Sequence, residues 1–334
     1  MLRSETAQEP ARMKRALAGL RLYQDAPRAA PRTPMPAIAS VRGGALRDYG
    51  GGAPDAPPVV FVPSLINPPN ILDLGEDRSL LRWLACRGHR PLLVDWGWEV
   101  EQRRTLSVAG HVEEILLPLI DGLDAPPVLV GYCLGGTMAI AAAARGRARA
   151  VATLAAPWRF AAYPDAARAL LASLWQQGRP TAERLGLFPM ELLQSAFWSL
   201  DPARTIAKFE RFAGLAAESE EARGFVALED WANDGPPIGE AAARELFEGF
   251  FAEDRPGAGN WMVAGAPVDP EALPCPVLNV VSTTDRIVPA SSVAPGGERR
   301  DLALGHVGMV VGGRAPNLLW EPLSDWLFRT AANC

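Results

Sequence analysis

The chain has 334 residues, which is enough for one large α/β domain with an insertion and a core that needs no disulfides. Hydrophobic residues make up 49% and charged residues 21%, close to globular averages, which excludes a chain that is disordered throughout. The net charge of −5 and the lack of a basic stripe exclude a surface built to contact nucleic-acid phosphates.

Residues 1–55 are rich in Ala, Arg, Pro and Gly and predict a partly irregular N-terminal extension with one short helix over 10–23. From residue 56 onward, short apolar runs alternate with amphipathic segments. The predicted strands are 59–62, 91–95, 127–130 and 150–154, and the predicted helices are 79–87, 108–123 and 137–145. This alternation is typical of a mainly parallel sheet with helices on both faces.

The alternation stops at residue 157. Residues 157–260 are mostly helical in pattern and rich in aromatic side chains, which predicts a helical cap or lid insertion over the sheet. A strand over 276–282, a short strand over 302–304 and a closing helix over 317–329 restore the α/β pattern. We therefore assign residues 56–156 and 261–334 to one core.

The sequence Gly131-Tyr132-Cys133-Leu134-Gly135 stands between a predicted strand and a helix of small residues. It has the form of a nucleophile elbow with cysteine in place of serine. Glycines at this sharp turn avoid Cβ clashes, and the following helix N-terminus favours a thiolate. The alternative is a buried cysteine in a glycine-rich turn, since free cysteine is often a core residue.

A nucleophilic cysteine needs a base, usually histidine, and an acid that orients it. Of three histidines, His89 fits a solvent-exposed turn and His111 a structural place on an amphipathic helix. His306 follows the last short strand, where the catalytic histidine of such a sheet is expected. Asp285 follows the strand over 276–282, although an aspartate there is also typical of an Asx turn.

The order Cys133, Asp285, His306 matches that of the α/β-hydrolase fold, so we predict this fold with a Cys-His-Asp triad. Its oxyanion hole needs two backbone amides. One is expected at Leu134, directly after the nucleophile. The second is expected in the loop after the first core strand, at Leu65 or Ile66.

The four cysteines, Cys86, Cys133, Cys275 and Cys334, form no CxxC pair and show no zinc-ligand spacing with histidine. The first residues have no apolar run, and nowhere do about 18 apolar residues follow one another. We therefore expect a cytoplasmic protein with free thiols, without a secretory signal, a transmembrane segment, a metal site or a cofactor.

Eight stretches together resemble the catalytic subunit of class III polyhydroxyalkanoate (poly-3-hydroxybutyrate) synthases. They are LINPP at 65–69, ILDL at 71–74, DRSL at 77–80, VDWG at 94–97, GYCLGG at 131–136, FVALEDW at 225–231, DRIVP at 285–289 and GHVG at 305–308. Each stretch is short, but their joint order and spacing over residues 55–330 are specific to that family.

The resemblance implies that Cys133 accepts the acyl group of a (3R)-hydroxyacyl-coenzyme A, with His306 as general base and Asp285 as its acidic partner. It implies an acyltransferase that extends a polyester and releases coenzyme A. It also implies a second synthase subunit or a homodimer as partners, and the surface of polymer granules as a location. An acyl-CoA is itself a thioester, so transfer to Cys133 exchanges like for like.

Two other functions are open on the sequence alone. The same triad could serve a hydrolase, namely a thioesterase, an esterase or a polymer depolymerase, although ordinary esterases use serine at the elbow. A non-catalytic binding or granule-associated protein is the third reading, and the complete set of Cys133, Asp285 and His306 argues against it.

Overall fold

A computed structural model gives the fold and describes residues 6, 8–30, 32–53, 56–98 and 100–332. Its described residues form two compact units. The larger unit takes in residues 34–189 and 235–334, and the smaller unit takes in residues 1–33 and 190–234.

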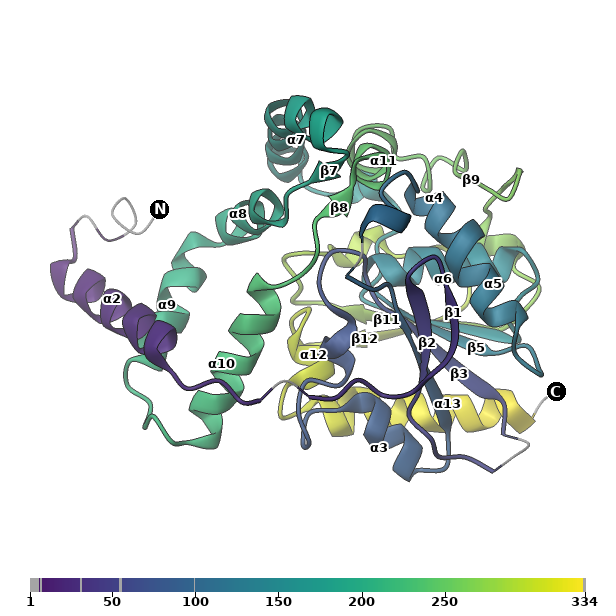
Figure 1. Cartoon of the computed structure of the whole chain (residues 1–334), viewed down its shortest axis with the longest axis horizontal. Coiled ribbons are helices and arrows are strands. Elements are labelled where there is room, and N and C mark those ends of the chain that lie inside the picture. Colours follow the sequence, from purple (N-terminus) through teal and green to yellow (C-terminus); the bar gives the residue numbers. More distant parts are fainter. Residues whose placement is uncertain (1–5, 7, 31, 54–55, 99, 333–334) are drawn as a thin grey trace. The chain divides into compact units, whose positions relative to one another are not determined.

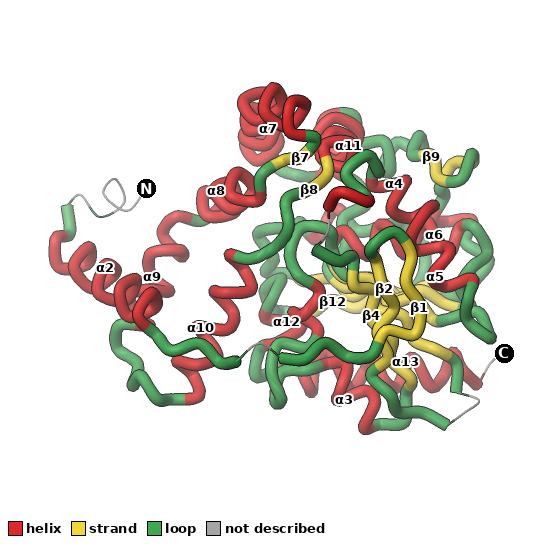
Figure 2. Tube along the Cα trace, viewed as in Figure 1, coloured by secondary structure: helices red, strands yellow, loops and turns green. Residues whose placement is uncertain are grey.

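The larger unit is built on an eight-stranded sheet with the order β1-β2-β4-β3-β5-β6-β11-β12. Its strands, yellow in Figure 2, are β1 (Ala37–Val41), β2 (Gly44–Asp48), β3 (Pro58–Val62), β4 (Arg90–Asp95), β5 (Val128–Tyr132), β6 (Ala150–Leu154), β11 (Val277–Ser282) and β12 (Glu298–Leu302). All neighbours from β4 to β12 are parallel, whereas β1 and β2 pair antiparallel with each other and β2 with β4.

Helices cover both faces of this sheet because right-handed crossovers to its two sides place them on opposite faces. One face carries α4 (Val108–His111), the π-helical turn η3 (Val112–Leu116), α5 (Leu117–Asp121) and α6 (Leu134–Ala144). The other face carries α3 (Leu80–Cys86), η8 (Pro316–Trp320) and α13 (Glu321–Ala332), with α12 (Gly308–Val311) just before η8 (Figure 1).

Burial explains why the central strands read as unbroken apolar runs. Every residue of β3, β5 and β6 is buried, as parallel strands covered on both faces require. The helix predicted over 108–123 forms as the succession α4, η3 and α5. Pro118 lies in the first turn of α5 and cannot donate a backbone hydrogen bond, so the helix widens into a π turn just before it.

The insertion after β6 is helical, as its pattern predicts. In the larger unit it contributes η4 (Phe160–Ala162), α7 (Asp165–Leu185), β7 (Leu187–Phe188), β8 (Ile238–Gly239), α11 (Glu240–Arg244) and η5 (Glu245–Ala252). Strands β7 and β8 pair antiparallel, so the chain segments before residue 189 and after residue 237 lie side by side. The remaining short elements are η1 (Pro69–Leu72), η2 (Val100–Gln102), β9 (Met262–Val263), β10 (Ala266–Pro267), η6 (Pro270–Ala272) and η7 (Ala290–Ser292).

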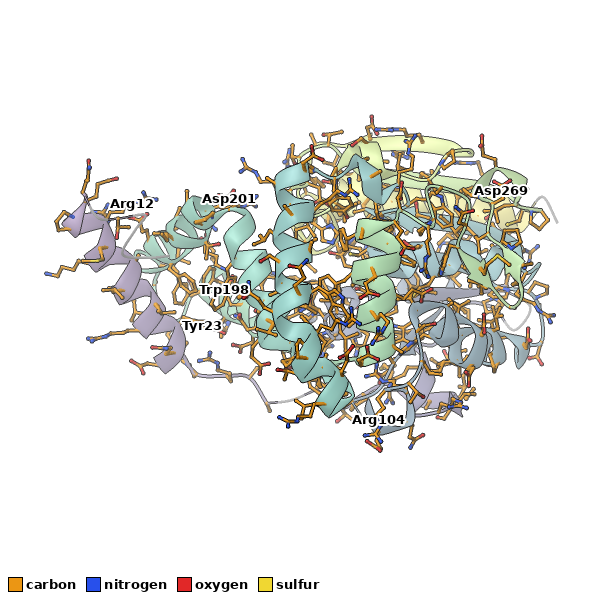
Figure 3. All side chains as sticks on the ribbon, turned by 90° about the horizontal axis from the view of Figure 1, so that it is seen from above. Arg12, Tyr23, Arg104, Trp198, Asp201 and Asp269 are labelled. Atoms are coloured by element: carbon orange, nitrogen blue, oxygen red, sulfur yellow. The ribbon has the colours of Figure 1, made fainter. Side chains whose placement is uncertain are left out.

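The smaller unit combines α2 (Pro10–Asp25) with α8 (Met190–Leu200), α9 (Pro202–Phe212) and α10 (Glu220–Asn233). Gly19 lets α2 approach α9, since a Cβ there would stand 1.9 Å from the carbonyl oxygen of Phe209. Arg12 and Tyr23, both labelled on α2 in Figure 3, bind carboxylates of the unit: Arg12 Nε bonds Glu210 at 2.9 Å, and the Tyr23 hydroxyl donates to Asp230 at 2.7 Å.

Two features differ from the sequence-based expectations. Residues 37–48, assigned above to an N-terminal extension, supply β1 and β2 of the main sheet. Their hairpin turns through Arg42 and Gly43 at φ 47° and 79°, and Arg-Gly is a weaker turn signal than Asn-Gly. The last strand spans residues 298–302, whereas the sequence predicted 302–304. The prediction missed it because most of its residues are charged and exposed, so it has no apolar pattern. The domain boundaries otherwise stay predictions.

Among the described helices, none combines the length and the apolar character needed to cross a membrane.

Candidate active site

Cys133 lies at the junction of β5 and α6 with φ 55° and ψ −131°. A non-glycine residue at positive φ is strained by about 1–3 kcal/mol and persists only where its surroundings hold it. Here the Cys133 amide donates to the Leu154 carbonyl at 2.9 Å, and its carbonyl accepts from the Gly136 amide at 2.8 Å. The chain therefore forms the sharp strand-to-helix turn of a nucleophile elbow.

The glycines around Cys133 are needed for close backbone approach. A Cβ on Gly131 would stand 2.3 Å from the Cα of Gly136, and one on Gly136 would stand 2.3 Å from the Cβ of Ala156. A Cβ on Gly135 would stand 2.0 Å from the Val62 carbonyl oxygen. The elbow thus packs directly on the end of β3, where the predicted oxyanion loop begins.

Asp285 is both an Asx-turn residue and the partner of His306. Its Oδ1 accepts hydrogen bonds from the amides of Ile287 at 2.7 Å and Val288 at 3.0 Å. Its Oδ2 lies 2.5 Å from Nδ1 of His306. The turn thus fixes one carboxylate oxygen, which leaves the other free to orient the imidazole. The Asp285 side chain is 0% exposed and that of His306 is 8% exposed, so water competes little for this contact.

His306 also interacts electrostatically with Cys133. Because Nδ1 faces Asp285, Nε2 is left for proton transfer with the nucleophile. Burial lowers the pKa of the imidazole, but the charge of Cys133 and the bond to Asp285 outweigh it and raise the pKa from 6.5 to about 10. A histidine that interacts with both a cysteine and a carboxylate is the arrangement expected beside a cysteine nucleophile.

Tyr132, which precedes the nucleophile, was not singled out from the sequence. Its buried hydroxyl donates to the His306 carbonyl at 3.3 Å, and its ring lies 5.1 Å from the imidazole. Burial and the charges of Cys133 and Asp285 raise the pKa of Tyr132 well above 10. It therefore stays neutral and supports the histidine loop.

The predicted oxyanion amides lie on the two segments that meet at the elbow. Leu134 begins α6, and the loop of Leu65 and Ile66 follows β3. The Ile66 amide is engaged by Ser64 Oγ at 3.1 Å, which favours Leu65 as the second donor. Trp96 at the end of β4 steadies this loop, because its indole donates to the Pro63 carbonyl at 3.1 Å.

The structure places the other two histidines away from this chemistry. His111 is buried, with Nδ1 2.7 Å from the Ser107 carbonyl, as its structural reading predicts. The prediction of a solvent-exposed His89 is wrong, since its ring is buried against Phe328 and Nε2 lies 2.8 Å from Ser324 Oγ. A Gly-His-Arg turn looks polar in sequence, but the closing helix covers it.

The described part of the chain holds no group of three or more His, Cys, Asp or Glu side chains suited to a metal ion. Three of the cysteines, Cys86, Cys133 and Cys275, are free thiols, and Cys334 lies outside the described residues. Of these thiols, Cys133 is the one whose charge acts on a histidine with an acidic partner. The geometry is that of an acyl-transfer site.

Comparison of the whole chain with known proteins finds relatives of the same kind as the motifs indicate. The chain is 29% identical over 297 residues to the poly(3-hydroxyalkanoate) polymerase subunit PhaC of Allochromatium vinosum, covering 83% of this chain and 82% of the relative. It is 26% identical over 296 residues to the subunit of the same name from Thiocystis violacea, with 83% and 82% covered. The subunit from Haloferax mediterranei is 27% identical over 286 residues, 80% of this chain and 58% of the relative.

These relatives confirm the resemblance to polyhydroxyalkanoate synthase subunits, although no family model matches the chain. Among solved structures, the Paleococcus ferrophilus monoacylglycerol lipase matches with a TM-score of 0.51 and 16% identity over 85% of this chain and 98% of the lipase. The α/β hydrolase GrgF from Penicillium sp. sh18 matches with a TM-score of 0.52 and 18% identity over 91% and 100%. They confirm the predicted α/β-hydrolase fold.

Proposed function

We propose that this protein is an acyltransferase that polymerises (3R)-hydroxyacyl-CoA into polyhydroxyalkanoate through a thioester on Cys133. The observation that carries the proposal is a cysteine at the elbow of an α/β-hydrolase fold, which acts electrostatically on a histidine whose Nδ1 faces Asp285. The relatives named as polymerase subunits support the same activity.

In the first half-reaction the Cys133 thiolate attacks the thioester carbonyl of the acyl-CoA. Amides of Leu134 and Leu65 stabilise the oxyanion of the tetrahedral intermediate. The bond to the coenzyme A sulfur then breaks, and the His306 imidazolium gives its proton to that sulfur. The products are free coenzyme A, an acyl thioester on Cys133 and a neutral imidazole.

The second half-reaction begins from a site whose electrostatics have changed. The acylated sulfur carries no negative charge, so a main cause of the raised His306 pKa is gone and the neutral imidazole is favoured. That imidazole can accept the proton of an incoming 3-hydroxyl group. The hydroxyl oxygen forms an ester bond to the acyl carbon, the bond to Cys133 breaks, and the thiolate–imidazolium pair returns.

Aromatic side chains of the insertion support transfer to an alcohol in preference to water. Phe160 and Phe250 are each 1% exposed or less, and their ring centroids lie 5.0 Å apart. Water-poor surroundings of this kind slow hydrolysis of a reactive thioester. No cofactor is needed, since coenzyme A enters as part of the substrate. We further propose a second synthase subunit or a homodimer as partners and the polymer granule surface as the working location.

The identity of the product tests the proposal. Purified protein is given (3R)-hydroxybutyryl-CoA, and free coenzyme A, free 3-hydroxybutyrate and insoluble polyester are measured together. Coenzyme A release matched by polyester is the expected result. Release matched by free hydroxy acid would make the protein a hydrolase and overturn the proposal.

Two alanine variants make the test specific to the elbow. Cys133→Ala should abolish both coenzyme A release and polymer formation. Cys86→Ala is the matched control, because it removes an exposed free thiol from α3, and it should keep both activities. Polymer formed by Cys133→Ala would eliminate the assigned nucleophile.

A further inference from the structure

Residues 155–163 follow β6 and are hydrogen-bonded both to α6 and to η7. The Thr137 hydroxyl, in the first turn of α6, donates to the Pro157 carbonyl. On the other side, the amides of Trp158 and Arg159 donate to the Ser292 carbonyl at 2.7 and 2.8 Å. Ser292 belongs to η7, seven residues after Asp285. The segment is therefore anchored to the helix that Cys133 begins and to the loop that follows Asp285.

Tyr163 ends this segment, and its ring is fixed by packing. It is 8% exposed, stacks on Phe160 at 5.8 Å with the planes 9° apart, and meets Phe251 edge-on at 5.1 Å. Its amide donates to the Phe160 carbonyl at 3.2 Å, and the Phe160 amide is bonded to Asp254 at 2.6 Å. The phenol therefore has little freedom to leave its position.

The electrostatics place the Tyr163 hydroxyl within the field of the reacting groups. Burial raises its pKa well above 10, and the charges of Cys133 and Asp285 raise it further. The same three causes act on Tyr132, whose hydroxyl bonds the His306 backbone. Tyr163 consequently stays protonated, and its hydroxyl is a polar group on a ring that packs against the apolar rings of Phe160 and Phe251.

We propose that the Tyr163 hydroxyl hydrogen-bonds the 3-hydroxyl group of the acyl chain and so makes this residue a determinant of specificity for hydroxylated acyl-CoA substrates. The inference rests on the proposed function and names a substrate contact within it. A neutral phenol can both donate and accept, as can the substrate hydroxyl. A buried hydroxyl built to pair with a substrate group disfavours the analogue that lacks this group.

The test compares two substrates in one variant. Acylation of Cys133 is followed by mass spectrometry in the first turnover with 3-hydroxybutyryl-CoA and with butyryl-CoA, which lacks the 3-hydroxyl. In Tyr163→Phe we expect kcat/KM for acylation to fall about tenfold for the hydroxylated substrate, the effect of one lost hydrogen bond. The rate with butyryl-CoA should stay unchanged, which also shows that the variant is folded.

Tyr49→Phe is the matched control. It removes a phenol hydroxyl bonded to Asp73 at 3.1 Å beside the first residues of β4, at the amino end of the sheet, and should leave both rates unchanged. Equal loss with both substrates in Tyr163→Phe would show a role in holding the thiolate or the fold and would overturn the specificity proposal. Unchanged rates with both would overturn it as well. If the wild-type protein forms no adduct with either substrate, the proposed function fails and the inference fails with it.

Discussion

At the scale of single residues, the chemistry depends on how one imidazole is charged. His306 has a pKa of about 10 because the Cys133 charge and the Asp285 bond outweigh burial. In contrast, burial lowers the pKa of both His89 and His111 to about 4. Because the pKa of one histidine is raised and those of the other two are lowered, a titration of the three imidazole rings can test this account directly.

We expect nuclear magnetic resonance of the histidine rings to show His306 protonated up to about pH 10 in the wild-type protein. In Cys133→Ala its pKa should fall, since the raising charge is removed, while His89 and His111 serve as internal controls and stay neutral down to about pH 4. A His306 ring that is neutral at pH 7 in the wild-type protein would contradict the raised pKa of this imidazole.

The same shift has a consequence for stability. Because the folded-state pKa of His306 lies above the ordinary 6.5, the folded state binds this proton more tightly than the unfolded state does. The contribution is fully present below pH 6.5 and is lost as the pH rises through about 10. The difference in unfolding free energy between wild type and Cys133→Ala should therefore shrink between pH 6.5 and 10, as denaturant titrations can show.

Gly135 tests the close packing of the elbow. Gly135→Ala places a Cβ 2.0 Å from the Val62 carbonyl oxygen and 2.6 Å from that of Pro63, both of them backbone atoms. Overpacking of this kind costs about 1–3 kcal/mol of unfolding free energy or more. Gly75→Ala is the control, because nothing lies within 4 Å of the added atom. Equal denaturation midpoints for the two variants would show that the elbow has room to adjust.

The three residues that the structure brings together, Cys133, Asp285 and His306, could be named from the sequence. Each follows a predicted strand of the parallel sheet, and the chemistry of cysteine restricts its partners. Tyr163 could not be found in this way, because it is one aromatic residue among many in the insertion. Its segment is held by bonds that residues 157–159 make to Thr137 and Ser292, which are distant in sequence.

At the scale of elements, the loop after β3 is held by the residue that follows β4. Trp96 is 4% exposed, and its indole donates to Pro63, next to the loop with Leu65 and Ile66. In Trp96→Phe the Pro63 carbonyl loses this donor, which should lower the unfolding free energy by about 1–3 kcal/mol. It should also slow acylation of Cys133, since the oxyanion loop loses a support.

Trp175→Phe separates these two effects. Trp175 is 5% exposed and its indole likewise donates to one acceptor, Glu248, at 2.8 Å, but it lies in α7. We expect a similar loss of stability in this variant and an unchanged acylation rate. If both variants slow acylation equally, the Trp96 bond has no particular role in the oxyanion loop.

The central strands were predictable because burial on both faces leaves long apolar runs. The edges of the sheet were not. Strand β12 is largely exposed and begins with Glu298, Arg299 and Arg300, so its sequence resembles a loop. Strands β1 and β2 are short, and their Arg-Gly turn is an uncommon hairpin signal. Edge strands gain their stability from pairing, which composition does not reveal.

At the scale of the whole molecule, the smaller unit joins segments that are distant in sequence, residues 1–33 and 190–234. Asp230 links the two segments. Its carboxylate accepts hydrogen bonds from the Tyr23 hydroxyl at 2.7 Å and from the Arg28 guanidinium at 3.0 and 3.1 Å. From the sequence, the first segment was predicted to belong to the N-terminal extension and the second to the helical cap. The pairing of Asp230 with Tyr23 and of Glu210 with Arg12, each across about two hundred positions, brings them together.

We expect Asp230→Ala to speed amide exchange in α2 by about tenfold, since the two donors lose their acceptor. The pKa of Tyr23, raised to about 12 by burial and then by Asp230, should fall in ultraviolet titration. Asp269→Ala, which removes a capping carboxylate from η6 in the larger unit, should change neither. Unaltered exchange in α2 of Asp230→Ala would show that other contacts hold this helix.

The most direct test of the central claim is the mass of the peptide that carries Cys133 after rapid acid quenching with (3R)-hydroxybutyryl-CoA. We predict one or more hydroxybutyryl units attached to Cys133 as a thioester that hydroxylamine removes, formed at the rate of coenzyme A release and absent from Cys133→Ala. Coenzyme A release without an adduct on Cys133, or with the acyl group on another residue, would contradict the claim that this sulfur carries the growing chain.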